Sequence, residues 1–482
     1  MIRALALPSA TSLPGAGTLA LWAVAALAAT ALLALAMRRR EDAFPLLAVL
    51  ALPFRVPISA DNKTVNLLIP LYLVVAAGTL VHLLLPALRA RSQRARPVSA
   101  ADEPLHWRRL AFWGSPRGLE VILFGAIALY AVQAIYSSDH ARAAENVAFF
   151  YIPFALLFVL LRRVRWSRQL LLRCLAVTVV LAALFAGIGF IEYARKSLFL
   201  NPKVVAANQY DNYFRVNSLF FDPNIYGRFL ALVMIAVTTI VLWGSRRREI
   251  VGGAAVLAWL LGGLVTSFSQ SSIAALLLGL AVLAAYRWNA RATVYSSLGL
   301  LALAGAIVLL APASLHFGLK GSGGSTSNAT SGRSKLISGG LDLFARRPLQ
   351  GFGSGSFEVE YKRHTNATAE NATSASHTIP VTVAAEQGLP GLAVYVALLL
   401  AALFVLFGRA GRSPPRIALA ACFVALVLHT WAYADFLEDP FTWAILAIGV
   451  ALARQERDAR PARGERPPPE LDDHTAALGA AG

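Results

Sequence analysis

The chain has 482 residues, of which 57% are hydrophobic and only 15% are charged, and its formal net charge is +18. A soluble domain would carry charge on about a quarter of its residues, so this composition excludes an ordinary soluble protein. The positive excess does not indicate nucleic-acid binding, because the arginines fall in short segments between long apolar runs, as the positive-inside rule requires. We therefore expect an all-α, polytopic integral membrane protein that sits in a lipid bilayer and binds no nucleic acid.

Thirteen apolar runs are candidates to cross a hydrocarbon core of about 30 Å. The run 44–60 contains Pro53, Arg55 and Pro57, so it either spans the membrane or only dips into it. The count is therefore about 12–13 transmembrane helices, and the side of the N-terminus stays open. The candidate spans are 17–37, 44–60, 65–88, 119–137, 147–161, 169–191, 224–243, 249–268, 271–286, 292–312, 379–408, 416–434 and 439–454.

The basic segments alternate along the chain, which assigns one set of loops to the cytoplasmic side and the other to the exterior. One long exterior segment contains an amphipathic pattern over 333–344, which predicts a helix at the membrane surface, followed by a Gly-rich turn over 351–355. The expected organisation is N-terminal membrane helices with a basic cytoplasmic loop (1–118), central membrane helices (119–312), a long external loop (313–378), C-terminal membrane helices (379–454) and a disordered cytoplasmic tail (455–482).

His377 stands at the entrance of the apolar run that begins at residue 379. Ionisable groups at such a position are costly and are candidates for function. Glu386, Gly388 and Gly391 follow it on the same predicted helix. From the residues alone, two interpretations stay open: a catalytic imidazole, or an imidazole that caps the helix while the two glycines allow close packing.

Three arginines fall on the exterior side, where the positive-inside rule does not place them: Arg215, Arg228 and Arg333. A guanidinium binds phosphate oxygens in a bidentate fork, so these residues could hold a lipid-linked diphosphate. Snorkelling at the membrane interface or ion pairs within the loops would explain them equally well. We expect no metal site and no cofactor, because no nucleotide-binding fingerprint and no cluster with metal-ligand spacing is found in the sequence.

The order and spacing of these motifs resemble the O-antigen ligase/polymerase superfamily. The resemblance rests on His377 followed by Gly388-x-x-Gly391, on the upstream run from Gly332-Arg333 to Gly351-x-Gly353, on the Ser-rich tract 266–272, and on the element 215–224. It covers about 210–408, and the many spans extend it across the chain.

The resemblance implies a GT-C-like, metal-independent glycosyltransferase in the bacterial cytoplasmic (inner) membrane, with its active site facing the periplasm or exterior. Such an enzyme takes a glycan from a polyprenyl (undecaprenyl) diphosphate carrier and passes it to the hydroxyl of a glycan or lipid acceptor in cell-surface polysaccharide assembly. Carried over to this chain, His377 would be the general base and Arg333 would hold the diphosphate. A ligase, a polymerase and a protein-directed transferase stay open, because their motifs overlap.

Gln270 departs from the family pattern, since many members carry an arginine in the Ser-rich turn. Glutamine cannot neutralise a phosphate, so either Arg215 or Arg228 supplies the second positive charge or the donor is held differently.

A transporter or flippase of lipid-linked or polysaccharide substrate is the alternative from another functional class. It would place charged residues near the middle of the bilayer and would use paired broken helices. The predicted spans carry few charges at their centres, and the polar residues gather on one side, which favours an enzyme at the interface.

Overall fold

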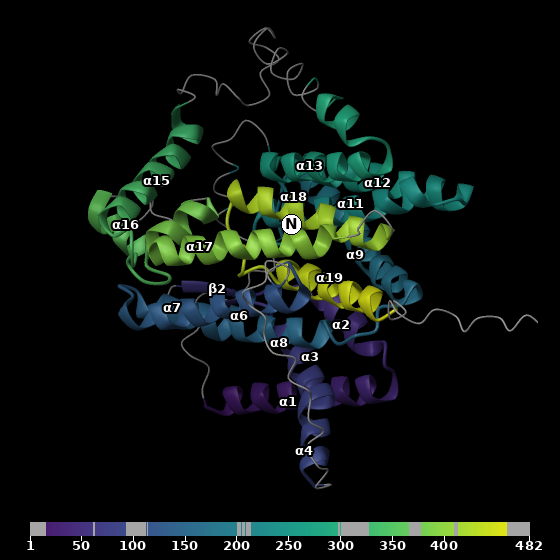
Figure 1. Cartoon of the computed structure of the whole chain (residues 1–482), viewed down its shortest axis with the longest axis horizontal. Helices are drawn as coiled ribbons and strands as arrows, with labels where there is room; N and C mark the ends of the chain where they lie inside the picture. Colours follow the sequence, from purple (N-terminus) through teal and green to yellow (C-terminus); the bar gives the residue numbers. More distant parts are fainter. Residues whose placement is uncertain are drawn as a thin grey trace, which may run out of the picture.

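The structure is a computed structural model that describes residues 16–60, 63–92, 114–199, 214–296, 327–365, 378–408 and 413–459, with the single residues 112, 204, 208, 299 and 376. The described chain is almost entirely helical (Figure 1). Its elements are α1 (Ala16–Arg39), α2 (Ala43–Ala51), β1 (Val56–Ala60), β2 (Lys63–Leu67), α3 (Ile69–Thr79), η1 (Leu80–Leu84), α4 (Leu85–Ser92), α6 (Pro116–Gln133), η2 (Ala134–Tyr136), α7 (His140–Asn146), η3 (Val147–Tyr151), α8 (Ile152–Leu161), α9 (Arg168–Arg195), α11 (Pro223–Trp243), α12 (Arg247–Thr266), α13 (Gln270–Arg287), α15 (Ser327–Arg346), α16 (Phe357–Thr365), α17 (Ile379–Phe407), α18 (Pro414–Trp431) and α19 (Pro440–Asp458).

Ten helices in the described part of the chain are long and apolar enough to cross a membrane, which confirms the prediction of an all-α polytopic membrane protein. α19 is not among the ten, since Arg454, Glu456 and Arg457 make its last turns polar. Most of the predicted span 292–312 lies outside the described residues, so the count of 12–13 stays a prediction. The ten are Ala20–Arg39, Ile69–Arg89, Pro116–Tyr136, His140–Leu161, Arg168–Arg195, Pro223–Trp243, Arg247–Thr266, Gln270–Arg287, Ile379–Phe407 and Pro414–Trp431.

The run 44–60 is not one continuous helix, which decides against the first of the two alternatives left open for it. α2 ends at Ala51, and the chain then forms an antiparallel hairpin in which Val56 pairs with Leu67 and Ala60 pairs with Lys63. Proline explains the break, because Pro53 has no backbone N–H to continue the helix. The alternative of a broken, dipping segment is therefore the one that the structure supports.

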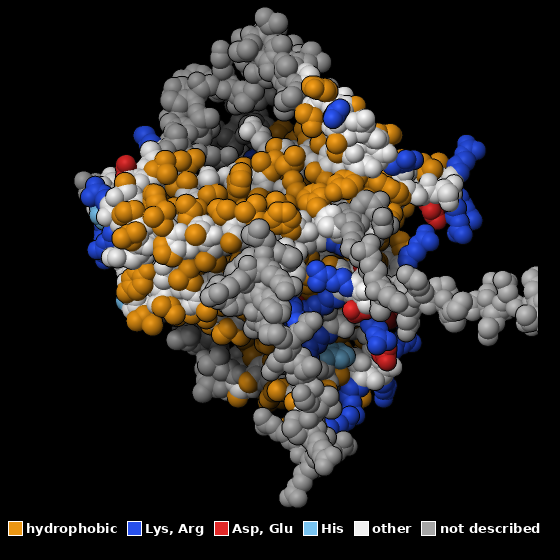
Figure 2. Space-filling model, in the orientation of Figure 1, with side chains coloured by type: hydrophobic (Ala, Val, Ile, Leu, Met, Phe, Trp, Pro, Cys, Tyr) orange, Lys and Arg blue, Asp and Glu red, His pale blue; other side chains and the backbone are white. Residues whose placement is uncertain are grey.

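The long helices run across the view in Figure 1, and α15 and α16 lie beside one end of α17. We call this end of the bundle the site end: α11, α13, α17 and α19 begin there, and α6, α9, α12 and α18 end there. Figure 2 shows hydrophobic side chains across the middle of the molecule and most of the visible Lys and Arg side chains toward its right-hand side. This distribution matches a bundle with one strongly basic end.

Ion pairs neutralise part of the charge at the basic end of the bundle, opposite the site end. Glu120 contacts both Arg162 and Arg454 at 2.6 Å, which ties α6 to the end of α8 and to the last turns of α19. The three side chains are only partly exposed, so screening by water is incomplete. The contacts fix the ends of three helices far from the site end.

α11 is the central helix of the bundle. It packs against α9, α12, α13 and α18, and most of its side chains are buried. A helix that is apolar on all sides belongs in such a position. Close approach to α13 depends on Gly279, where a side chain would collide with Ile235. The first turn of α11 reaches the site end, and it carries Asn224 and Arg228 into the polar region described below.

Candidate functional site

His377 lies outside the described residues, but its neighbours define how the chain enters α17. Ser376 is fully buried, and its backbone N–H donates to Thr382 Oγ1 at 3.0 Å. The Ser376 hydroxyl donates to the Thr378 carbonyl at 2.7 Å. These bonds close a tight turn immediately before Ile379. The positions on both sides of residue 377 are therefore fixed at the site end of the bundle.

α17 is kinked at Gly388, which has φ 66° and ψ −161° inside an otherwise helical run. The left-handed φ favours glycine. The kink frees the Leu389 N–H, which donates to the Pro348 carbonyl at 2.7 Å. The carbonyls before the kink accept from the Gly-rich turn: Gly353 N–H donates to Glu386 O at 2.8 Å. The kink is thus the docking point of the segment that follows α15.

Glu386 holds the same turn with its side chain. Its carboxylate accepts from the backbone N–H groups of Gly355 at 2.8 Å and Phe357 at 3.1 Å. Only 6% of the residue is exposed. Gly391 leaves room for Gln387 one turn earlier on the same helix, since a Cβ there would collide with that side chain. At Gly388, where a Cβ would collide with the Leu349 carbonyl, the docked segment supports the packing interpretation, and Glu386 has a structural role next to the first turns of α17.

Gly351 provides a test of this docking. It has φ 65°, and a Cβ there would stand far inside van der Waals distance of the Glu386 carbonyl oxygen. We expect Gly351→Ala to lower the melting temperature measurably, because the left-handed conformation alone costs about 1–2 kcal/mol in any residue other than glycine. Thermal unfolding of the purified protein measures this. Gly252→Ala is the matched control, since nothing lies within 4 Å of that position. Equal melting temperatures for the two variants would contradict the docking.

Arg215 lies half-buried at the site end, just before α11. Its Nε donates to the Ser267 carbonyl at 3.2 Å and its Nη2 to Asn224 Oδ1 at 3.3 Å. Asn208 brackets its backbone with two hydrogen bonds, at 3.0 and 3.1 Å. Within the described ranges, no carboxylate pairs with this guanidinium. Its partners are neutral, so they orient Arg215 without cancelling its charge.

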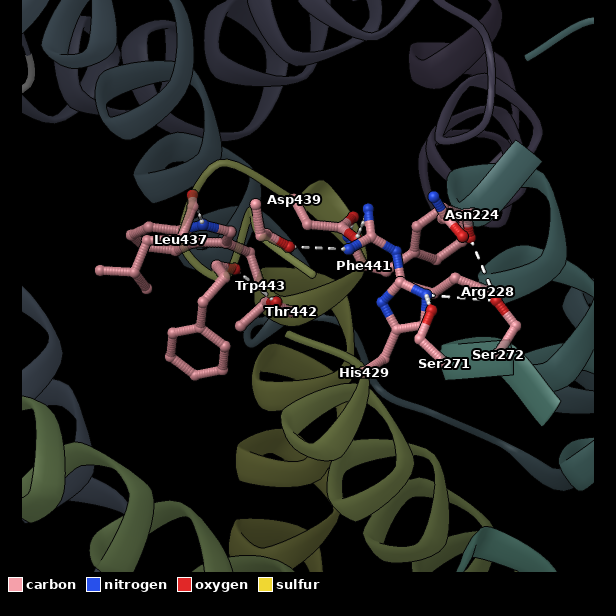
Figure 3. Close-up of polar contacts among 12 residues, drawn as sticks. Asn224, Arg228, Ser271, Ser272, His429, Leu437, Asp439, Phe441, Thr442 and Trp443 are labelled. Carbon is pink, nitrogen blue, oxygen red and sulfur yellow. Dashed lines mark hydrogen bonds and ion pairs between the residues drawn. The ribbon is translucent and has the colours of Figure 1, made fainter. Parts of the chain in front are cut away.

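The Ser-rich turn between α12 and α13 forms a polar network next to Arg215. Ser269 caps α13, and its Oγ donates to Asn224 Oδ1 at 2.9 Å, the same atom that accepts from Arg215. Ser271 and Ser272 each lie 3.2 Å from His429 Nε2 on α18. Figure 3 shows these side chains converging from three helices. The network fixes the ends of α11, α13 and α18 relative to one another.

Gln270 is the exposed residue of this turn. It occupies the first position of α13, between the capping Ser269 and the buried Ser271. An exposed side chain at this position can face a substrate, whereas its serine neighbours face the protein. The structure therefore leaves Gln270 available at the site end and gives it no buried partner within the described residues.

Arg228 has a different environment from Arg215. Its Nη2 lies 2.7 Å from Asp439 Oδ2, and the two side chains are 3% and 1% exposed. Asp439 also caps α19 by accepting from the Phe441 N–H at 2.9 Å. Figure 3 places this ion pair beside His429. The charge of Arg228 is thus already balanced inside the protein.

Arg333 lies on α15, which the structure extends to both sides of the predicted surface helix. The helix ends at Arg346, before Pro348, as predicted. Leu336 and Leu343 pack into a small core with Phe352, Phe357, Tyr361 and Ala385, so the apolar face contacts protein. Nothing in the described side chains shows what Arg333 contacts.

Sequence reasoning missed Asn224 as the link between Arg215 and the serines, and it missed Asp439 as the partner of Arg228. The signal for Asp439 was an acidic residue directly before Pro440, the pattern of a capped helix start. His429 is a buried, hydrogen-bonded residue of this network, through its contacts with Ser271 and Ser272. In the described residues, no group of three His, Cys, Asp or Glu is placed to hold a metal ion.

Residues 254–396 match the family model described as O-Antigen ligase. The matched segment begins in α12 and ends in α17, so it contains the Ser-rich turn, α15, the Gly-rich turn and the kink at Gly388. No match was found among curated proteins.

Proposed function

We propose, from the match of residues 254–396 to the O-antigen ligase family model, that this membrane protein transfers a glycan from a polyprenyl diphosphate to an acceptor hydroxyl. The acceptor oxygen attacks the anomeric carbon of the donor sugar, and the bond from that carbon to the diphosphate oxygen breaks. The hydroxyl proton passes to His377, and polyprenyl diphosphate leaves. An imidazole suits this step, because its unperturbed pKa lies near neutrality.

The observation that carries the proposal is the contrast between Arg215 and Arg228. Both were candidates for the second positive charge that Gln270 does not supply. Arg228 is paired with Asp439, whereas the partners that the described residues give to the Arg215 side chain, the Ser267 carbonyl and Asn224, are neutral. We therefore assign the diphosphate to Arg215 and Arg333, where guanidinium groups stabilise the negative charge that develops on the leaving group.

The same proposal fixes the orientation. The site end faces the exterior of the cytoplasmic membrane of a bacterium, and the basic end faces the cytoplasm, in agreement with the positive-inside rule. A diphosphate carried on a lipid reaches the site end from the outer leaflet. The donor is then a lipid-linked glycan, and the acceptor is a glycan or a lipid carrying one.

Conservative replacement of the two arginines tests the diphosphate assignment. Arg215→Lys and Arg333→Lys keep the charge but lose the bidentate fork. We expect each to lower the transfer rate by about 10- to 100-fold, the equivalent of one charged hydrogen bond of about 1.5–3 kcal/mol. Transfer assays with labelled lipid-linked donor measure this. Arg346→Lys is the matched control, since Arg346 is exposed in the last turn of α15. Unchanged transfer rates in both variants would show that Arg215 and Arg333 do not bind the donor diphosphate.

The activity itself is tested with the purified full chain in lipid nanodiscs and a defined polyprenyl-diphosphate oligosaccharide. Release of polyprenyl diphosphate together with a lengthened or newly attached glycan is the expected result. Mass analysis of the product separates the two variants of the reaction: a polymerase joins two lipid-linked units, and a ligase moves the glycan to a different acceptor. Movement of intact donor across the bilayer without any new glycosidic bond would overturn the proposal in favour of a flippase.

A further inference from the structure

A cleft opens at the site end, and the mechanism above does not use it. Its walls come from α6, α7, the first turns of α17 and the loop 432–439. Ile379, Thr382 and Val383 line it, and Thr382 is the residue that bonds Ser376. The cleft therefore borders the hydrogen-bonded segment formed by Ser376, Thr378 and Thr382.

The charge of this cleft argues against a phosphate ligand. Among the described residues, its lining carries four acidic side chains, Glu358, Glu386, Asp435 and Glu438, and one basic side chain, Arg142. Carboxylates that stay ionised repel an anionic diphosphate, and protonated carboxyl groups supply no positive charge to bind it. They accept hydrogen bonds from hydroxyl groups readily. The cleft suits a neutral ligand that is rich in hydroxyls.

Asn146 gives the cleft an unused hydrogen-bonding group. It is 4% exposed, and its Nδ2 donates to Tyr130 Oη at 2.8 Å and to Glu438 Oε1 at 3.2 Å, both on the cleft wall. Its Oδ1 has no hydrogen-bond partner in the described structure. A buried amide oxygen left without a partner is costly. A ligand hydroxyl in the cleft would satisfy it.

The loop that carries the two acidic residues is held rigidly. Trp443 Nε1 donates to the Leu437 carbonyl at 2.8 Å, and Thr442 Oγ1 to the Phe436 carbonyl at 2.6 Å, as Figure 3 shows in part. Asp435 adopts φ 65°, a conformation that is uncommon outside glycine and that marks a constrained position. The acidic groups are thus presented by a fixed frame, as a specific binding site requires.

The Glu438 carboxyl, when protonated, can both donate and accept hydrogen bonds. Burial raises the pKa of the Glu438 carboxyl well above its usual value, and the neighbouring Asp435 and Glu386 act in the same direction, while Arg142 opposes them. This shift favours the protonated form of the carboxyl. A protonated carboxyl beside a hydroxyl-rich ligand donates one hydrogen bond and accepts others.

We propose that this cleft binds a sugar ring of the acceptor glycan, with Asp435, Glu438 and Asn146 hydrogen-bonding its hydroxyls next to residue 377. This proposal rests on the proposed function and adds the location of the acceptor-binding site. The aromatic side chains of Tyr130 and Tyr395, which also line the cleft, supply apolar contact for the ring faces. The lipid-linked diphosphate stays with Arg215 and Arg333, outside the acidic cleft.

Direct binding tests this with probes that need no knowledge of the natural acceptor. Saturation-transfer NMR on the full chain in nanodiscs is recorded with a panel of methyl hexosides and methyl N-acetylhexosaminides, and separately with inorganic pyrophosphate. We expect at least one glycoside to bind, and Asp435→Ala and Glu438→Ala to weaken it at least tenfold. Glu438→Gln keeps a donor and an acceptor, so it should retain binding. Pyrophosphate binding should stay unchanged in all three variants.

Asp342→Ala is the matched control, because Asp342 is an exposed carboxylate on α15 outside the cleft. Absence of glycoside binding to the natural sequence, or equal binding in the Asp435→Ala and Asp342→Ala variants, would overturn the acceptor site. Loss of pyrophosphate binding in the Asp435→Ala variant would assign the cleft to the donor instead. These outcomes are separate from failure of the proposed function, which shows as a lack of glycan transfer by the natural sequence in nanodiscs.

Discussion

Replacement of His377 by alanine should abolish glycan transfer while the protein remains inserted and folded. The proposed step needs a group that accepts the proton of the acceptor hydroxyl, and general-base catalysis contributes about 10²- to 10⁴-fold to such reactions. Transfer of labelled glycan in nanodiscs should therefore fall by at least about 100-fold. The melting temperature should stay close to that of the natural sequence, because the turn around residue 377 is closed by Ser376, Thr378 and Thr382.

Two further measurements make the His377 result specific. Added imidazole should restore part of the rate to the His377→Ala variant, since a free base can enter the space of the missing side chain. His140→Ala is the control: His140 is an exposed histidine at the same end, where its Nε2 lies 3.0 Å from the Ile135 carbonyl. A normal rate in the His377→Ala variant would rule out the general base, and an equal loss in the His140→Ala variant would point to a general defect.

The sequence predicted the helical elements well because they depend on local properties. Apolar runs placed the ends of α11 and α17 within one residue, whereas α15 begins six residues before the predicted surface helix. The hairpin after α2 was not predicted, since Pro53 and Pro57 break a span without determining what replaces it. Local signals decide where an element ends, and long-range pairing decides what the next segment contacts.

The candidate site shows the same limit. The motif around Gly388 and the Gly-rich turn around Gly351 were both recognised, but their docking on one another joins segments that are far apart in sequence. Likewise, spacing could not show that Arg228 meets Asp439. An arginine that departs from the positive-inside rule indicates a partner of negative charge. Only tertiary structure shows whether that partner is a carboxylate of the protein or a phosphate of a substrate.

Removal of Arg228 should destabilise the protein more than any other single change considered above. Arg228→Met leaves the Asp439 carboxylate buried, at 1% exposure, without its counter-charge. Breaking a buried ion pair in this way costs about 3–5 kcal/mol. Unfolding of the purified protein by sodium dodecyl sulfate, followed by tryptophan fluorescence, measures the change. The Asp439→Asn variant keeps an acceptor for the Phe441 N–H and isolates the loss of charge.

The double variant Arg228→Met/Asp439→Asn separates folding from catalysis. Since neither charge is then left unpaired, we expect it to recover much of the stability lost in Arg228→Met, with a coupling energy within the range of about 0.5–3 kcal/mol known for contacting residues. If Arg228 serves only the fold, the double variant should transfer glycan at nearly the natural rate. Recovered stability together with a rate as low as that of Arg215→Lys would show instead that Arg228 shares the diphosphate. The purely structural assignment of Arg228 would then be wrong, and the ion pair with Asp439 would be an arrangement that the donor opens when it binds.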